Sequence, residues 1–224
     1  MMIRFKHIVA RELLMACRRR SDWMNPIVFF LCITCLLPLA TTANMAVLQS
    51  IGAGIIWLAI LLAQLLSFNH IFYYDYMDGS LEQWLLSAYP LPLMIGAKLL
   101  AHWLVLMLPL LCLSPVIALM YHLSGHQLLL LWVTLFIGTP SLYWLAALMA
   151  GLTVGVAHNR LLLTIILLPF YVPILIFSTG AVNHLYQINV LVPLMYLLII
   201  LILVLMAAPI ATAAMLRLSI AYDG

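Results

Sequence analysis

Carboxylate side chains are the groups in this sequence with the most chemical potential, because they can bind metals, transfer protons or pair with cations. The 224 residues contain only six acids, and three of them, Asp75, Asp78 and Glu82, lie in one polar stretch between Phe68 and Pro90. Asp75 and Asp78 are three residues apart at the predicted end of a helix, where the helix dipole disfavours carboxylates by about a few tenths of a kcal/mol. These acids therefore need a compensating interaction.

The residues after Asp78 predict a corner between two helices. Gly79 can adopt the left-handed conformation that ends a helix. Ser80, with Gln83 three residues later, has the form of a capping box that starts a new helix. We interpret the segment 75–90 as a cytoplasmic docking element, whose acids pair with arginine or lysine on a soluble partner. The alternative is an ordinary solvated loop. The predicted docking residues are Asp75, Asp78, Gly79, Ser80, Leu81, Glu82 and Gln83.

Catalytic and nucleotide-binding motifs do not accompany these acids. The sequence lacks a Gly-x-x-x-x-Gly-Lys-[Ser/Thr] phosphate loop, a His-Glu-x-x-His motif and a Gly-x-Ser-x-Gly elbow. Within the apolar runs the main ionisable side chain is His102, whereas proton pumps and ion-driven carriers place carboxylates or histidines in mid-membrane. We expect a chain without enzymatic activity, and if the protein does work on ATP, the ATP is bound elsewhere.

Histidine and cysteine side chains offer two weaker candidates for a metal site. His122, His126 and His184 lie on one side of the predicted membrane, but no carboxylate lies near them to support a metal ligand. Cys32 and Cys35 fall within an apolar run, where cysteines usually behave as small apolar residues. We assign no metal site and no disulfide framework.

The composition identifies an integral membrane protein. Hydrophobic residues make up 67% of the sequence, charged residues 7%, and the mean hydropathy is +1.22, whereas soluble domains carry about 25% charged residues. The formal charge of +3 gives no indication of nucleic-acid binding. The whole chain, 1–224, is predicted to form one transmembrane domain in contact with the lipid bilayer.

The segment 3–20 has the pattern of an amphipathic helix at the membrane surface. Basic side chains share one face and apolar side chains another, as in helices that lie against anionic lipid head groups. The basic face carries Arg4, His7, Arg11 and Arg18, and the apolar face carries Phe5, Val9, Leu13 and Ala16. A signal peptide is the competing interpretation, but about 26 residues precede the apolar core and further spans follow, which favours a retained helix.

Six apolar runs follow this segment, and about 20 residues are enough to cross the hydrocarbon core. The predicted spans are 26–43, 51–74, 91–121, 128–156, 161–181 and 188–216. Six spans place both termini, the segment 75–90 and the turn before Arg160 on one side. The nine basic residues all lie on or near that side: Arg4, Lys6, Arg11, Arg18, Arg19, Arg20, Lys98, Arg160 and Arg217. Because basic residues concentrate in cytoplasmic segments, we predict cytoplasmic termini.

Small residues and prolines within the spans predict close packing and kinks. Ala147, Gly151 and Gly155 are spaced four apart, which allows another helix to approach closely. Prolines remove a helix hydrogen bond and kink a span. The residues predicted to set packing or kinks are His102, Pro140, Gly151, Gly155, Pro169 and Pro173.

Four motifs together resemble the CcmB family of bacterial cytochrome c maturation, haem exporter protein B. They are Asp75-x-x-Asp78-Gly-Ser-Leu-Glu-Gln, Ala97-Lys-x-x-Ala-His-Trp103, Gly138-Thr-Pro140 and Leu167-Leu-Pro-x-x-x-Pro-x-Leu-Ile-Phe177. The resemblance runs from about residue 25 to the C-terminus, and the first motif is its most specific part. It implies an ABC-2-type permease subunit with six spans in the inner membrane of a Gram-negative-type bacterium.

The resemblance also implies partners and cofactors. A separate ATPase, CcmA, binds ATP and magnesium, and the membrane proteins CcmC and CcmD handle haem with the chaperone CcmE. In this interpretation the segment 75–90 couples ATP hydrolysis by CcmA to the spans, two copies of the chain form a homodimer, and the complex handles haem, although no cofactor is assigned to the chain itself. Two alternatives stay open: a generic ABC-2-type exporter of another substrate, and a non-transporting adaptor that anchors the ATPase.

Overall fold

The computed structural model describes residues 2–40, 45–68, 71–87, 89–152, 160–183 and 189–223, and all regular structure within these ranges is α-helical. The helices are α1 (Met2–Arg18), α2 (Arg20–Ala40), α3 (Met45–Phe68), α4 (Tyr73–Met77), α5 (Ser80–Leu86), α6 (Leu91–Met120), α7 (Gly125–Leu152), α8 (Arg160–Asn183) and α9 (Leu191–Asp223). Six spans are found in the described part of the chain, as predicted, and they begin in α2, α3, α6, α7, α8 and α9. The prediction of an all-α integral membrane protein is therefore confirmed.

Helix boundaries differ from the apolar runs that predicted them. α2 begins at Arg20 rather than at residue 26, and α3 begins at Met45 rather than at 51. Hydropathy marks only the part of a helix that lies in hydrocarbon, whereas the helical hydrogen bonds continue through polar residues at its ends. The second predicted span, 51–74, extends too far at its C-terminal end. α3 ends at Phe68, and the separate helix α4 follows it.

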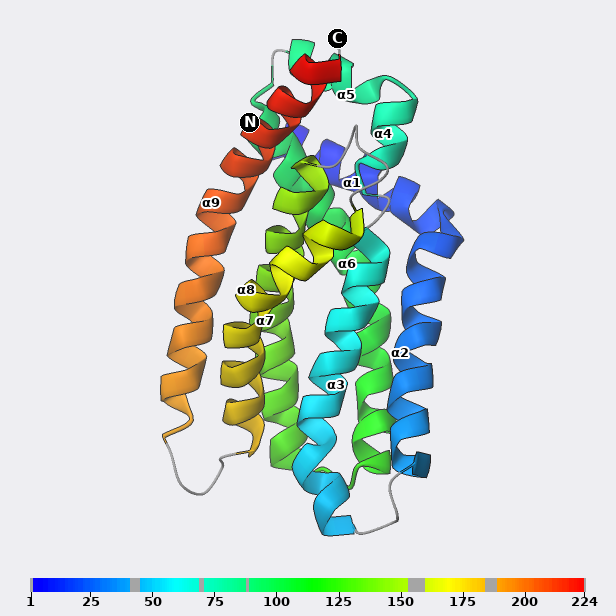
Figure 1. Ribbon diagram of the computed structural model, residues 1–224, viewed down its shortest axis with the longest axis vertical. Coiled ribbons are helices and arrows are strands. Elements are labelled where there is room, and N and C mark those ends of the chain that lie inside the picture. The colour runs from blue at the N-terminus through cyan, green and yellow to red at the C-terminus, as the bar shows by residue number, and fades with distance from the viewer. Residues whose placement is uncertain are drawn as a thin grey trace.

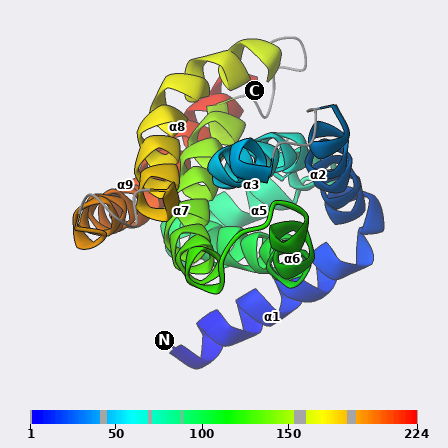
Figure 2. The ribbon, with the colours of Figure 1, turned by 90° about the horizontal axis from the view of Figure 1, so that it is seen from below.

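The spans form a bundle with α3 and α7 at its centre and α2 and α9 at its periphery (Figures 1 and 2). Most side chains of α3 and α7 are buried, whereas few of α2 and α9 are. Peripheral helices expose large apolar side chains such as Leu36 and Met206, which suits a lipid surrounding. Both chain ends lie at the same end of the bundle as α4 and α5 (Figure 1).

α1 runs across the end of the bundle instead of along the spans and packs against α6 (Figure 2). Its exposed side carries His7 and Arg11, as the amphipathic pattern predicts, together with Lys6. Its inward side buries Ala16 and also Glu12, which is only 1% exposed. The inward face of α1 is therefore covered by protein, and it contains an acid.

Two glycines allow close approach of the central helices. A Cβ atom at Gly138 would lie 2.6 Å from the Trp57 ring, and one at Gly151 would lie 3.2 Å from the Thr212 Cγ2 atom. Gly138 therefore admits the α3 tryptophan against α7, and Gly151 brings α7 and α9 together. Gly155, the second predicted packing glycine, lies outside the described residues.

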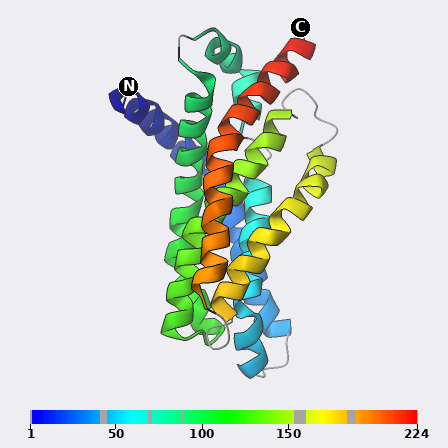
Figure 3. The same ribbon diagram turned by 90° about the vertical axis from the view of Figure 1, so that its left-hand side faces the viewer.

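The predicted kink residues lie in different surroundings. Pro140 is buried within α7, whereas Pro169 and Pro173 lie on the exposed side of α8. α8 bends along its length, and one end leans away from the bundle (Figure 3). His102 is half-buried on α6. One residue further on, the Trp103 Nε1 atom donates to the Thr139 hydroxyl on α7 over 3.0 Å, so two of the family motifs are in contact.

Candidate coupling site

The corner between α4 and α5 depends on a left-handed glycine. Gly79 has a φ of +72° and lies directly before α5, which confirms the prediction that this glycine separates two helices. The predicted capping box is wrong, because Ser80 is already the first helical residue and its hydroxyl donates to the Asp75 carbonyl oxygen over 3.2 Å. Asp78 stabilises the corner through a turn hydrogen bond, since its Oδ1 atom accepts the Ser80 backbone N–H two residues on over 3.0 Å.

The hydrogen bonds that Asp78 accepts favour its charged form. Its pKa lies below the ordinary value of 3.8, first because of the Ser80 side chain and then because of the Ser80 backbone. The carboxylate is exposed, so Asp78 both fixes the corner and presents a negative charge to solvent.

α5 has a buried apolar side and an exposed mixed side. Leu81 and Trp84 are buried against the bundle, whereas Glu82 and Gln83 are exposed. Leu86, at the end of the helix, is 88% exposed. We call the exposed set Asp78, Glu82, Gln83 and Leu86 the corner surface. An acidic surface with one protruding apolar side chain is suited to a protein partner that offers a cation and an apolar groove.

Asp75 is not part of the corner surface, which corrects the prediction that it pairs with a cation on a partner. Its side chain is 3% exposed and forms an ion pair with the Lys98 ammonium on α6. The Lys98 side chain is 2% exposed. The predicted position of Asp75 at the end of a helix is wrong, because Asp75 lies in the first turn of α4. Its burial, and not the helix dipole, requires the counter-charge that the buried lysine supplies.

Lys98 also contacts two other elements. The Glu12 Oε2 atom of α1 lies 3.4 Å from its Nζ atom, and the Trp84 ring centroid of α5 lies 5.3 Å from it. The other carboxylate oxygen of Glu12 accepts from the exposed Arg11 over 2.9 Å. One ammonium thus connects α1, α4, α5 and α6. We call Glu12, Asp75 and Lys98 the buried triad.

Sequence reasoning missed Glu12, although a signal was present. Glu12 lies three residues after Val9 and four before Ala16, on the apolar face of the predicted surface helix. An acid in that position implies a buried cation nearby, because an unpaired charge is costly to bury. The cation lies 86 positions away in sequence, so the pairing itself cannot be predicted from local spacing.

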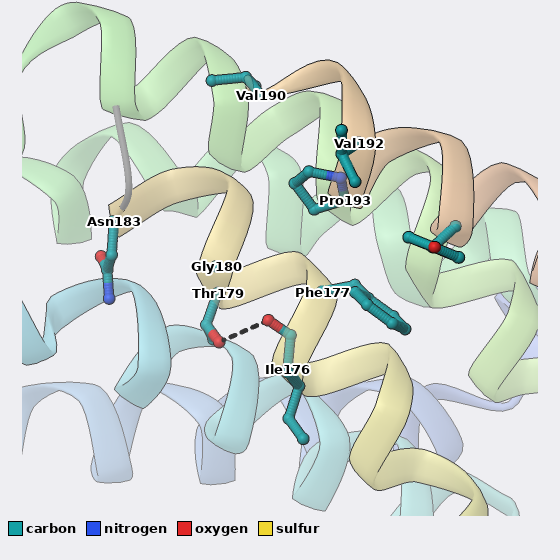
Figure 4. A pocket seen from close by; sticks show the side chains of 9 residues that line it. Ile176, Phe177, Thr179, Gly180, Asn183, Val190, Val192 and Pro193 are labelled. Atoms are coloured by element: carbon teal, nitrogen blue, oxygen red, sulfur yellow. Dashed lines mark hydrogen bonds between the residues drawn. The ribbon is translucent and has the colours of Figure 1, made fainter. Parts of the chain in front are cut away.

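The opposite end of the bundle contains an apolar pocket between α8 and α9 with a volume of about 420 Å³ (Figure 4). Phe177 and Tyr196 stack in it with ring centroids 4.9 Å apart. Two of its polar side chains are engaged within the protein, since Thr179 donates to the Leu175 carbonyl oxygen and Asn183 to the Ser50 carbonyl oxygen. The pocket therefore has the character of a lipid-facing depression.

The candidate metal ligands do not converge. Within the described residues, no group of three or more His, Cys, Asp or Glu side chains is arranged to hold a metal ion. The described cysteines, Cys17, Cys32, Cys35 and Cys112, are free thiols. His184 lies outside the described residues.

A bundle of six membrane spans with a surface helix and a polar corner at one end belongs to the class of multi-pass integral membrane proteins. The family model described as CcmB protein matches residues 3–219. The chain belongs to the CcmB family and is a membrane permease subunit.

Relatives in several bacteria support this membership. Heme exporter protein B of Pseudomonas aeruginosa is 44% identical over 80% of each chain. The protein of the same name in Paracoccus denitrificans is 39% identical over 96% of this chain and 99% of its own. That of Escherichia coli K12 is 40% identical over 80% of this chain and 81% of its own. The similarity therefore extends over most of the molecule.

Proposed function

We propose that this chain is the permease subunit of an ABC transporter for haem export in cytochrome c maturation, and that its corner surface docks a separate ATPase. Membership of the CcmB family and the names of the relatives, heme exporter protein B, support the haem export system. They favour neither the generic exporter nor the adaptor. The observation that carries the docking proposal is the exposed acidic and apolar side of α5, whose opposite side is anchored in the bundle.

In the proposed mechanism the ATPase, CcmA, moves the corner, and the corner moves the spans. The Asp78 and Glu82 carboxylates pair with cations of the ATPase, and Leu86 enters an apolar groove. Leu81 and Trp84 transmit the displacement inward because they are packed against the bundle. ATP and magnesium stay on the ATPase, and CcmC, CcmD and the haem chaperone CcmE complete the assembly.

We place the corner in the cytoplasm and the spans in the inner membrane. The basic segments of α1, the first turns of α6 and the last turns of α9 all lie at the end of the bundle that carries the corner (Figure 1). The positive-inside rule assigns that end to the cytoplasm. This orientation also brings the corner to the compartment in which ATP is available.

We further propose that two copies of the chain act together, since six spans form half of a usual ABC transporter pathway. The exposed apolar sides of the peripheral helices leave area for a second copy. No haem site is assigned to the chain.

The docking proposal is tested by charge reversal on α5. Glu82→Lys should abolish co-purification of the ATPase in mild detergent while membrane insertion is unchanged, because a lysine repels the cation that Glu82 attracts. Lys6→Glu, which changes an exposed charge on α1 by the same magnitude, is the matched control and should retain the ATPase. Equal recovery of the ATPase with Glu82→Lys and with the unmodified chain would refute docking at this surface.

A further inference from the structure

The buried triad contains more negative than positive charge. Glu12 and Asp75 contribute two carboxylates, and both side chains are at most 3% exposed. Lys98 is the one cation of the triad, while the other partner of Glu12, Arg11, is 57% exposed. A static joint between α4 and α6 requires only Lys98 and Asp75, so the second acid needs an explanation.

The two acids belong to elements with different freedom. Asp75 lies on α4, a five-residue helix at the end of the bundle, whereas Glu12 lies on the 17-residue α1, which packs along α6. A displacement of the corner therefore carries Asp75 away from Lys98 and toward solvent. Glu12 stays beside Lys98 because α1 and α6 are packed together.

We propose that Glu12 is the standby counter-ion of Lys98, which keeps the ammonium paired when the corner moves and Asp75 is released. This inference rests on the proposed function, in which an ATPase displaces the corner. In the released state Asp75 is solvated by water and Lys98 remains paired with Glu12, so no buried charge is left alone. Glu12 and Lys98 act as positioning residues and contact no substrate.

The energetic reason is the cost of an isolated buried charge. Removing one partner of a buried ion pair is strongly unfavourable, because the remaining charge has lost its water and gained nothing. If Glu12 were neutral, release of Asp75 would leave the Lys98 ammonium buried without a counter-ion. The released state would then become rarer by a factor of roughly a hundred to a few thousand.

The proposal predicts that neutral variants of the triad have opposite effects. Glu12→Gln raises the free energy of the released state, in which Asp75 has left Lys98. The corner therefore stays in the engaged state, in which Asp75 is paired with Lys98. Asp75→Asn removes the attraction that holds the corner and favours release, while Lys98 stays paired with Glu12. Lys98→Met also favours release, because it leaves Asp75 unpaired in the engaged state only. A network that served only structural support would loosen in the same direction with every variant.

The test measures the corner position in the assembled complex with its ATPase, in lipid nanodiscs. Spin labels at Met77 on α4, which is exposed but not part of the corner surface, and at the exposed Leu218 on α9 are placed in a chain whose four cysteines are replaced by serine. Double electron–electron resonance then reports the distance distribution without nucleotide and after vanadate trapping. We expect trapping to shift the distribution in the unmodified chain, Glu12→Gln to abolish the shift, and Asp75→Asn to produce it without nucleotide.

Arg11→Gln is the matched control, because it removes the exposed partner of Glu12 and leaves the triad intact; its populations should agree with the unmodified chain within about twofold. A shift in the same direction for Glu12→Gln and Asp75→Asn overturns the proposal, as does no shift for either. Both variants are nearly isosteric, so the test does not depend on Lys98→Met folding. Co-purification of the ATPase is measured on the same samples, and its absence from the unmodified complex indicates failure of the docking proposal instead.

Discussion

Replacement of Gly79 by alanine isolates the backbone contribution to the corner. Gly79 has a φ of +72°, and an added Cβ atom would meet no heavy atom within 4 Å. The cost is therefore that of a left-handed conformation in an L-residue, about 1–2 kcal/mol. Because α5 is short and begins directly after this residue, we expect the cost to appear as easier local opening of α5, with the bundle unaffected.

Hydrogen exchange measured by mass spectrometry gives this cost directly. A change of about 1–2 kcal/mol in local opening corresponds to roughly 5–30-fold faster exchange of the α5 amides. Gly79→Asn should accelerate exchange less, because asparagine tolerates the left-handed conformation better than alanine. Exchange in the spans should be unchanged in both variants.

Gly96→Ala provides the matched control, because Gly96 lies inside α6 and a Cβ atom there also meets nothing within 4 Å. Alanine is favoured over glycine in a helix by roughly 0.5–1 kcal/mol, so α5 exchange should not accelerate. Unchanged exchange in Gly79→Ala, or equal acceleration by alanine and asparagine, would show that the φ angle does not determine the stability of the corner.

Three further outcomes follow from the packing and electrostatics. Gly138→Ala should lower the free energy of unfolding of the detergent-solubilised protein by about 1–3 kcal/mol, because its Cβ atom would lie 2.6 Å from the Trp57 ring. Unfolding monitored by intrinsic fluorescence measures this change. Trp103→Phe and Thr139→Val should each cost about 1 kcal/mol through loss of their 3.0 Å hydrogen bond, and the double variant less than the sum. Because the pKa of Asp78 is lowered, its stabilisation of the corner is present above about pH 3.8 and is lost as the pH falls through the lowered pKa. A fluorescent label on α5 should report this acid-induced loosening of the corner, and Asp78→Asn should remove its dependence on pH.

The number and order of the spans could be predicted because lipid imposes a strong constraint on sequence. Every backbone polar group in hydrocarbon must be bonded within the helix, so each span needs a long apolar run. The helix ends could not be predicted, since outside the hydrocarbon no comparable constraint applies. The extension of α2 to Arg20 and the early end of α3 at Phe68 are both of this kind.

The candidate site likewise contains features that local sequence predicts and features that it does not. The corner at Gly79 was predictable because a left-handed residue between two helical segments has a local signature. The side-chain hydrogen bond to the start of α5 comes from Asp78 and not from Ser80 as predicted, because both residue types bond nearby backbone N–H groups and spacing alone does not decide between them. The burial of Asp75 depended on Lys98 and Glu12, which come from other helices, so local sequence could not show it.

Lys98, whose partners local sequence does not show, also determines how a displacement of the corner would be transmitted to the spans. A purely apolar contact between α5 and α6 would let the short helix slide, because dispersion contacts have little directionality. The Lys98 ammonium adds direction: it pairs with α4, lies over the Trp84 ring of α5 and pairs with α1. In the proposed mechanism a push on α5 therefore acts on α6 at one defined point, and α1 holds the charge that the corner leaves behind.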